Sequence, residues 1–288
     1  MNTLLRHFFS MALVFTFFSC SNDDTASTET ITDPLDPRLN YEALDISYGT
    51  DARQTFDLYL PANRSENTKI LILVHGGSWI SGDKEDMNPI KDLISTDLPN
   101  YAIANLSYRL ADASNSPYPM QIDDITAVVN YLADNQEKYT ISDTIGFIGL
   151  SSGAHLSLLW SYAFDVNNQV DMVCSVVGPT NFTDPAYLNS PNIEVQQLLQ
   201  LFGADEDMTL LEEMSPLHQL TAQAPPTILF YGGEDPLIPT TQGTALRDKL
   251  ESLGIPYQFT LYEEAGHGWL SGAEIIDTWS KLKIFINN

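Results

Sequence analysis

A serine between two glycines is the feature that most constrains the fold of this chain. Residues 149–153 read Gly-Leu-Ser-Ser-Gly, a G-x-S-x-G pentapeptide. An apolar, strand-like stretch precedes it at 144–148, and a helical pattern of apolar residues follows it at 154–160. Glycines at both ends of so short a turn allow one backbone to pass close to another. The pattern predicts a strand, a sharp turn and a helix, with the Ser151 hydroxyl exposed at the end of a sheet.

Paired glycines follow a second apolar run, at 70–74, which is typical of a buried parallel strand. Residues 75–79 read His-Gly-Gly-Ser-Trp. Backbone amides at such glycines can point into a cavity and stabilise the oxyanion of an acyl-transfer reaction, by roughly 3–4 kcal/mol per donor. His75 precedes the serine in the chain, so we expect it to be structural. We expect three amides to form the oxyanion hole, those of Gly76, Gly77 and Ser152.

Two glycine-rich loops downstream offer an acid and a base. The strand-like run 226–232 leads through glycines to Asp235, which two prolines hold in a rigid loop. A later run, 257–262, leads to His267, which lies between two glycines before the last predicted helix. The chain order serine, aspartate, histidine is that of the triad in α/β-hydrolases. In such a triad the histidine takes the serine proton and later protonates the leaving group, while the aspartate fixes the imidazole tautomer. The pattern predicts a serine hydrolase that works through an acyl-enzyme, with Ser151 as nucleophile.

Other residues compete for these roles. Ser152 adjoins the nucleophile but lies off the G-x-S-x-G register, and Glu234 is an acidic loop residue of the kind that is usually solvated. His155, on the helix after the turn, is interpreted as a packing residue, and His218 as a loop residue. His267 differs from both because it lies in a glycine-flanked loop at the end of a strand.

The joint pattern resembles the α/β-hydrolase carboxylesterases of the feruloyl/acetyl esterase type, the BD-FAE-like esterases, which are close to the hormone-sensitive-lipase-like esterases. The similarity runs from about Tyr41 to the C-terminus. In that family the serine, aspartate and histidine of these motifs form the triad, so the resemblance implies Ser151, Asp235 and His267 here. The matching segments are, in order, 75–79, 107–110, 118–124, 149–156, 178–180, 215–216, 232–239 and 266–268.

Three small residues depart from the family pattern. Ser152 replaces the usual alanine after the nucleophile, and Ala154 replaces a second glycine. Ser78 replaces the third glycine of an H-G-G-G loop, which places the chain nearer the H-G-G-x-W subgroup. The resemblance implies short acyl esters as substrates, acetyl or feruloyl, carried by plant or algal polysaccharide. Trp79 and Trp269 flank the oxyanion and histidine loops, where they either stack on a sugar or aromatic acid or pack in the core.

Apolar and amphipathic segments alternate over residues 41–288, which predicts a mostly parallel sheet with helices on both faces. By the resemblance this is an α/β-hydrolase fold and one catalytic domain. Residues 180–222 interrupt the alternation, and we expect them to form a small cap insertion that shapes the acyl or alcohol site. The candidate strands are 55–60, 69–75, 101–107, 143–149, 171–177, 226–232 and 257–262. The candidate helices are 119–135, 152–164, 240–253 and 272–286.

Composition narrows the possible partners. The chain has 288 residues and a net charge of −25, which disfavours binding to nucleic acid or to an anionic membrane by charge alone. The five histidines include no pair at helical i, i+4 spacing, and no phosphate-binding glycine loop is present. We therefore expect no metal and no nucleotide cofactor, and a small-molecule or polysaccharide ester as the partner.

Residues 1–19 have the pattern of a bacterial lipoprotein signal peptide. Arg6 precedes a hydrophobic run from Phe8 to Phe18 that is too short to span a membrane and ends near Cys20. Similarity to a lipobox predicts that Cys20 is lipidated with three acyl chains, more than stable anchoring needs. Polar residues 20–40 are then a flexible tether. The expected location is the bacterial cell envelope, anchored to the outer membrane on its periplasmic or surface side; the alternative is an ordinary cleaved signal with an incidental cysteine.

Two other functions stay open at this point. One is a serine peptidase of the prolyl-oligopeptidase type, which shares the triad order but usually carries a propeller of several hundred residues. The other is a non-catalytic glycan-binding lipoprotein on a hydrolase scaffold, which has no need for an intact triad. The sequence leaves the natural ester, the acyl preference and the oligomeric state undetermined.

Overall fold

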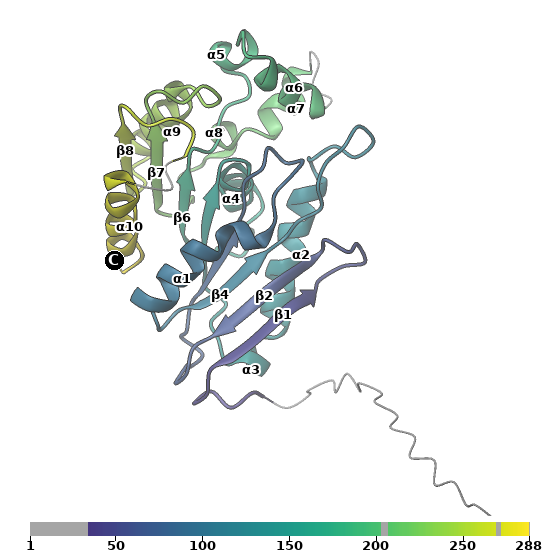
Figure 1. Ribbon diagram of the computed structural model, residues 1–288, viewed down its shortest axis with the longest axis vertical. Coiled ribbons are helices and arrows are strands. Elements are labelled where there is room, and N and C mark those ends of the chain that lie inside the picture. Colours follow the sequence, from purple (N-terminus) through teal and green to yellow (C-terminus); the bar gives the residue numbers. More distant parts are fainter. Residues whose placement is uncertain (1–33, 203–206, 269–271, 288) are drawn as a thin grey trace, which may run out of the picture. The chain divides into compact units, whose positions relative to one another are not determined.

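The computed structural model describes residues 34–202, 207–268 and 272–287 (Figure 1). The described helices and strands belong to one compact unit. Its centre is a sheet of eight strands in the order β1-β2-β4-β3-β5-β6-β7-β8. β2 is antiparallel to both of its neighbours, and the other pairs are parallel. The strands are β1 (Tyr41–Ser47), β2 (Thr55–Leu60), β3 (Ile70–Val74), β4 (Ala102–Leu106), β5 (Ile145–Leu150), β6 (Val170–Val176), β7 (Thr227–Gly232) and β8 (Tyr257–Tyr262).

Each face of the sheet carries its own hydrophobic core, because alternate residues of a strand point to opposite sides. Ile70 and Ile72 of β3 join the core on the face covered by α2, α4 and α9. Leu71 and Leu73 join the core on the face covered by α1 and α10. The predicted mostly parallel sheet with helices on both faces is thus confirmed (Figure 1). The helices are α1 (Asn88–Asp97), α2 (Met120–Asp134), α3 (Gln136–Tyr139), α4 (Ser152–Ala163), α5 (Pro185–Leu188), α6 (Ile193–Leu201), α7 (Met208–Glu213), α8 (Pro216–Gln219), α9 (Thr240–Ser252), α10 (Ala273–Ile286) and the 3-10 helix η1 (Lys84–Met87).

The predicted strands and long helices match the observed ones to within two residues at each end, and β2 and β8 coincide with their predictions. β1 and α1 have no counterpart among the predicted elements. β1 is an edge strand of exposed and half-buried residues, and Asp45 interrupts it with a φ of 54°. Ile94 is the buried residue of α1, so neither element has the apolar pattern that marks a buried strand or helix.

Four short helices, α5 to α8, occupy the segment between β6 and β7, within the range expected as a cap insertion. Figure 1 draws α5, α6 and α7 beyond the end of β6. α6 carries apolar residues at helical spacing from Val195 to its C-cap, Phe202. Buried side chains from this segment, including Phe182, Tyr187 and Phe202, join the core that α4 packs into, so the segment is anchored to the domain.

Residues 34–40 do not behave as the tether expected over 20–40. Leu35 donates its amide to the Lys138 carbonyl at 2.9 Å, and the amide of Arg64 donates to the Pro37 carbonyl at 3.1 Å. The compact unit therefore includes residues 34–40. These backbone hydrogen bonds hold the segment against the domain although its composition is polar. Residues 20–33 lie outside the described part of the chain.

A buried lysine joins the edge of the sheet to the loop that follows β3. The Lys84 ammonium, at the start of η1, donates to Asp45 and Asp57 at 2.5 Å each, and 5% of the lysine side chain is exposed. Asp57, on β2, is also buried. A charge out of water is stable only when it is paired, so the lysine and Asp57 depend on each other.

We predict that Lys84→Ala lowers the free energy of unfolding by about 3–5 kcal/mol, because it leaves the Asp57 carboxylate buried without its cation. Urea denaturation of the two proteins measures the change. Lys69→Ala is the matched control, since Lys69 pairs with Asp171 at 2.5 Å but the lysine side chain is 45% exposed. We expect the control to lose less than about 1 kcal/mol. Equal losses in both variants would contradict the role given to burial.

Candidate active site

The turn between β5 and α4 holds Ser151 in a strained conformation. Its φ is 49° and its ψ is −118°, a region that L-residues rarely adopt. A Cβ added at Gly149 would lie 2.5 Å from the Ala154 Cα, and one at Gly153 would lie 2.2 Å from the Val74 carbonyl oxygen. Both positions therefore require glycine. The Ser151 amide donates to the Val176 carbonyl at 2.8 Å, which fixes the turn against the neighbouring strand.

Three predicted residues meet at this turn in one hydrogen-bonded series. Ser151 Oγ lies 3.0 Å from His267 Nε2, and His267 Nδ1 lies 2.7 Å from Asp235 Oδ2. The Asp235 side chain is 1% exposed and that of His267 is 24% exposed. A carboxylate can only accept, so Nδ1 carries the proton and Nε2 is left with a lone pair toward the serine hydroxyl. This geometry allows His267 to take a proton from Ser151.

The loops that carry the acid and the base are packed against each other. The other oxygen of Asp235, Oδ1, accepts from the amides of Leu237 and Ile238 at 2.8 and 3.0 Å. A Cβ on Gly232 would lie 2.4 Å from the Ala265 carbonyl oxygen, so the loop after β7 approaches the loop after β8 as closely as backbones can. Glycines at this contact bring Asp235 within reach of His267, although the two are 32 residues apart in the chain.

The loop after β3 lies beside the serine turn. A Cβ on Gly76 would lie 3.3 Å from the Ser151 Cβ, and Gly77 has a φ of 118°, which favours glycine. The Gly77 carbonyl accepts from the amides of Ile80 and Ser81 at 3.1 and 3.0 Å, which closes the loop on itself. Ser152 is the first residue of α4, and amides in the first turn of a helix have no acceptor within the helix. The three expected oxyanion donors therefore lie on two segments that adjoin at Ser151.

Trp79 and His155 fasten this loop to the rest of the domain. The Trp79 indole donates to His155 Nδ1 at 3.2 Å, so Nε2 carries the imidazole proton and donates to the Met214 carbonyl at 2.8 Å. Both side chains are buried, and Trp79 also packs edge-on against Phe202. Trp79 thus packs in the core, the second of the two alternatives considered for it. Trp269 lies outside the described residues.

The other residues considered for a catalytic role have hydrogen-bond partners outside the Ser151, His267 and Asp235 series. His75 is fully buried, stacks on Tyr108 with ring centroids 4.1 Å apart, and donates Nδ1–H to the Gly76 carbonyl at 2.6 Å. Burial lowers the pKa of His75, which is consistent with a neutral, structural side chain. Glu234 is exposed, and its backbone amide donates to the Ala265 carbonyl. Its side chain makes no hydrogen bond to His267 in the described part of the chain. His218 is exposed and bonds to Thr183 at 2.9 Å.

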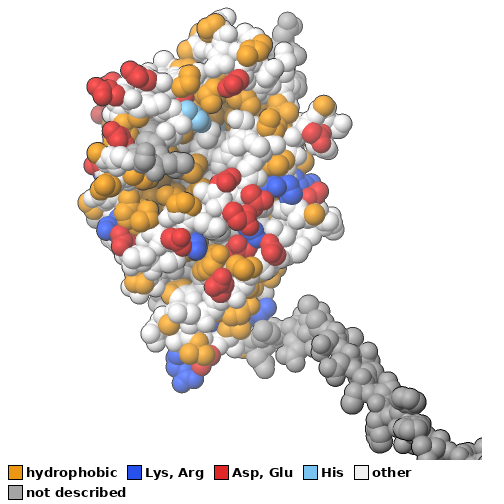
Figure 2. Space-filling model, in the orientation of Figure 1, with side chains coloured by type: hydrophobic (Ala, Val, Ile, Leu, Met, Phe, Trp, Pro, Cys, Tyr) orange, Lys and Arg blue, Asp and Glu red, His pale blue; other side chains and the backbone are white. Residues whose placement is uncertain are grey.

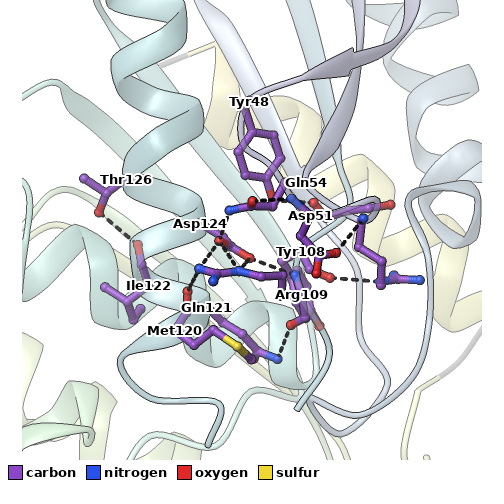
Figure 3. Close-up of polar contacts among 12 residues, drawn as sticks. Tyr48, Asp51, Gln54, Tyr108, Arg109, Met120, Gln121, Ile122, Asp124 and Thr126 are labelled. Atoms are coloured by element: carbon purple, nitrogen blue, oxygen red, sulfur yellow. Dashed lines mark hydrogen bonds and ion pairs between the residues drawn. The ribbon is translucent and has the colours of Figure 1, made fainter. Parts of the chain in front are cut away.

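A buried polar network supports the same loop from the side of α2 (Figure 3). Asp124 is fully buried and accepts two hydrogen bonds from the Arg109 guanidinium to Oδ1, at 2.6 and 2.9 Å, and one from Gln54 at 2.8 Å. Gln121, one turn earlier, donates to the carbonyls of Trp79 and Arg109 at 2.8 and 2.7 Å. Arg109, Gln121 and Asp124 fall within two of the motifs that carry the family resemblance, at 107–110 and 118–124, but the motifs alone do not indicate what they contact.

A cavity of about 370 Å³ opens at Ser151. Ser151, His267 and Gly77 line it together with apolar residues of β5, β6, α1 and α10. No sequence signal marks these apolar residues, because each has the pattern of an ordinary core position.

Neither a metal site nor a membrane-spanning helix is found in residues 34–202, 207–268 and 272–287. No group of three His, Cys, Asp or Glu side chains there is placed to hold a metal ion. No helix in those ranges is long and apolar enough to cross a bilayer. Cys20, the expected lipidation site, lies outside them.

Acid should destabilise the fold through His155. Burial lowers the pKa of His155 to about 4 from an ordinary value of 6.5. As the pH falls below 6.5 the unfolded chain binds the proton and the folded chain does not, so stability is lost between pH 6.5 and 4. We predict that this residue accounts for about 2 kcal/mol of the loss between pH 7 and 5, and that His155→Gln removes that share. Urea denaturation at both pH values measures the difference, and equal pH dependence in the two proteins would contradict the prediction.

Known proteins that are similar to this chain are named as esterases. The BD-FAE family model matches residues 56–250. A probable isoprenylcysteine alpha-carbonyl methylesterase of Arabidopsis thaliana is 25% identical over an alignment of 258 residues that covers 79% of this chain and 51% of that protein. Esterase LipC of Mycobacterium tuberculosis is 22% identical over an alignment of 260 residues that covers 84% of this chain and 64% of that protein. The chain therefore spans about half to two thirds of the length of these relatives.

Solved structures share the fold. A truncated carbohydrate esterase from gut microbiota aligns with a TM-score of 0.69 at 20% identity, over 88% of this chain and 99% of that one. An esterase from Thermogutta terrifontis with bound butyrate aligns with a TM-score of 0.69 at 17% identity, over 85% and 93% of the two chains. The fold is that of the α/β-hydrolases, and the match of the family model to most of the domain shows that the chain belongs to the BD-FAE family.

Proposed function

We propose that the chain is a serine carboxylic-ester hydrolase that works through an acyl-enzyme. One observation carries the proposal: Ser151, His267 and Asp235 form an uninterrupted hydrogen-bonded series at a strained turn beside a cavity. The order of roles along that series is nucleophile, base and orienting acid. The names of the relatives, esterases and a methylesterase, support the same reaction class.

In the first step Ser151 Oγ attacks the ester carbonyl carbon while its proton passes to His267 Nε2. The carbonyl oxygen becomes an oxyanion, which accepts hydrogen bonds from the amides of Gly76, Gly77 and Ser152. Asp235 stabilises the imidazolium across the 2.7 Å contact to Nδ1. The carbon–oxygen bond to the alcohol then breaks, and the alcohol leaves with the proton from Nε2.

In the second step water attacks the acyl carbon. Its proton passes to His267 Nε2, and the same amides hold the new oxyanion. The bond to Ser151 Oγ breaks, the serine recovers the proton from Nε2, and the carboxylic acid is released. Both steps use the same base and the same three backbone amide donors, as expected of a triad mechanism.

The resemblance favours acetyl or feruloyl esters, carried by polysaccharide, as substrates. Solved structures named as a carbohydrate esterase from gut microbiota and as an acetyl ester-xyloside bifunctional hydrolase support a carbohydrate ester. Acidic residues outnumber basic ones by 38 to 13, and acidic side chains are numerous on the face in Figure 2. A surface of this charge favours a neutral or cationic substrate over a strongly anionic one.

A lipid anchor at Cys20 is the second part of the proposal. The hydrophobic run from Phe8 to Phe18, followed by a cysteine and a polar segment, supports lipidation of that cysteine in a bacterial envelope. An enzyme held at the outer membrane would meet polysaccharide as it arrives at the cell.

The triad is tested by substitution and steady-state kinetics with p-nitrophenyl acetate. We predict that Ser151→Ala abolishes turnover without unfolding the protein, because a smaller side chain replaces a half-buried one that lines a cavity. Asp235→Asn and His267→Ala should each lower kcat by at least about a thousandfold. Glu234→Gln is the matched control for the acid, since it makes the same chemical change one residue away, and it should keep nearly full activity.

Three outcomes would redirect the assignment. Activity retained by Ser151→Ala would exclude that serine as the nucleophile, and a larger loss from Glu234→Gln than from Asp235→Asn would move the acid by one residue. A preference for a prolyl-anilide over p-nitrophenyl acetate would favour the peptidase. Absence of fluorophosphonate labelling at Ser151 would favour the non-catalytic glycan-binding protein.

The anchor is tested by membrane fractionation in a bacterial host. We predict that the wild-type protein is found with the membranes and incorporates labelled fatty acid, whereas Cys20→Ser incorporates none. The substituted protein should accumulate as unprocessed precursor or appear in the soluble fraction. A wild-type protein that is soluble and unlabelled would disprove the anchor and leave the esterase proposal untouched.

A further inference from the structure

Tyr108 contacts both segments that carry the proposed oxyanion donors. It lies two residues after the end of β4, and its side chain is fully buried. Its hydroxyl donates to the His75 carbonyl, on the loop after β3, at 2.9 Å. Because a hydroxyl has one proton, the 3.4 Å contact with the Ser152 hydroxyl, at the start of α4, leaves Tyr108 as the acceptor. One buried side chain therefore bridges the two segments.

A hydrogen bond to a carbonyl also orients the amide that follows it in the chain. The atoms of a peptide group lie in one plane, and in a trans peptide the C=O and the N–H point in opposite directions. The His75 carbonyl and the Gly76 amide belong to the same peptide group. By holding that carbonyl, the Tyr108 hydroxyl sets the direction of the Gly76 amide.

The next amide is oriented in the same way by the His75 imidazole. Nδ1–H donates to the Gly76 carbonyl at 2.6 Å, and that carbonyl shares a peptide group with the Gly77 amide. The imidazole in turn stacks on the Tyr108 ring, with centroids 4.1 Å apart and an angle of 7° between the planes. Tyr108 thus supports the Gly77 amide through the His75 ring.

Close packing leaves this arrangement little freedom. A Cβ on Gly82 would meet the Gly76 carbonyl oxygen and would lie 2.6 Å from His75 Nδ1, so the backbone at Gly82 covers that hydrogen bond. The Arg53 guanidinium donates to the carbonyls of Gly82 and Tyr108, at 2.7 and 3.0 Å, and joins the two backbones. Burial raises the pKa of Tyr108, so its hydroxyl keeps the proton that it donates.

The amides that these contacts orient are placed to bind a ligand. Within the described part of the chain, the amides of Gly76, Gly77 and Ser152 have no hydrogen-bond acceptor. The carbonyl in each of their peptide groups does have a donor, since the Ser151 carbonyl accepts from the His155 amide at 3.0 Å. Amides that are fixed but unoccupied in this way are suited to an anion that forms during a reaction.

We propose that Tyr108 is a positioning residue of the oxyanion hole, which sets the amides of Gly76 and Gly77 before a substrate binds. The inference rests on the proposed esterase function and concerns a residue outside its triad. Donors that are fixed in advance stabilise the transition state more than the bound substrate, because the negative charge develops only there. Loss of the Tyr108 hydroxyl should therefore lower kcat and leave KM nearly unchanged.

The first test compares two buried tyrosines, with p-nitrophenyl acetate as substrate. For Tyr108→Phe we expect kcat to fall at least about tenfold and KM to change less than about twofold, since loss of a whole oxyanion donor costs about a hundredfold or more. Tyr162→Phe is the matched control, because its hydroxyl is also buried and lies 2.9 Å from Thr227 Oγ1, outside the site. Its kcat should change less than about twofold. A smaller loss in Tyr108→Phe, an equal loss in both variants or a loss confined to KM would overturn the proposal.

The second test concerns the His75 donor. Asparagine and leucine have side chains of the same branched shape, but only asparagine offers an N–H close to the position of Nδ1. We expect His75→Asn to keep a kcat at least about tenfold above that of His75→Leu, and equal values in the two folded variants would overturn the link to Gly77. Urea denaturation shows whether both variants are folded, and if either is not, the tyrosine pair decides.

A trifluoromethyl ketone separates this inference from the esterase proposal. Ser151 Oγ adds to the ketone carbon while its proton passes to His267 Nε2, which leaves an oxyanion in the hole without turnover. In fluorine NMR titrations with trifluoromethyl ethyl ketone we expect Tyr108→Phe to bind at least about tenfold more weakly than the wild type, and Tyr162→Phe to bind equally. An adduct in a wild type that hydrolyses no ester would contradict the esterase proposal alone. Ester hydrolysis by the wild type, with the same ketone affinity in both tyrosine variants, would overturn this inference alone.

Discussion

The lack of space around the turn at Ser151 is the constraint on which the rest of the site depends. A Cβ on Gly149 would meet the backbone of α4, and one on Gly153 would meet the backbone at the end of β3, so α4 can begin only where β5 ends and only beside β3. A residue keeps a strained backbone conformation when several surrounding contacts require it. Here the hydrogen bond from the Ser151 amide to the Val176 carbonyl is one more such contact. The serine hydroxyl is held at the sheet end by the packing of three strands, and the other groups of the site are arranged around that fixed point.

Buried hydrogen bonds hold the loop after β3 from two directions. His155 of α4 accepts the Trp79 indole proton, and Gln121 of α2 donates to the Trp79 carbonyl. Oxyanion donors are effective when they are fixed before the reaction, because no energy is then spent in aligning them. The Asp124 and Arg109 pair extends this support by one turn along α2, since Gln121 also donates to the Arg109 carbonyl (Figure 3). A loop rich in glycine is thus made rigid by residues outside it.

Local patterns in the sequence predict the parallel strands and the order of the three hydrogen-bonded residues. The strands are continuous apolar runs because both their faces are buried, and glycines mark the turns where backbones touch. Elements that are stabilised by contacts with residues far along the chain have no such local pattern in the sequence. β1 is stabilised by pairing with β2 and by Lys84, and residues 34–40 by carbonyls and amides far along the chain. Gln121 and Asp124 are recognisable as parts of motifs, yet the hydrogen bond from Gln121 to Trp79 and the pairing of Asp124 with Arg109 appear only in the folded structure, where α2 packs beside these loops.

Helix α10 packs against the sheet in one part and lines the cavity in another. Its last turns place Leu282 and Ile286 in the core against the sheet, which secures the helix to the domain. Its first turns, with Ile275, line a space that the core leaves open beside Ser151. Protein interiors are normally packed to the density of organic crystals, so an apolar gap of about 370 Å³ beside Ser151 forgoes contacts that a filled core would make.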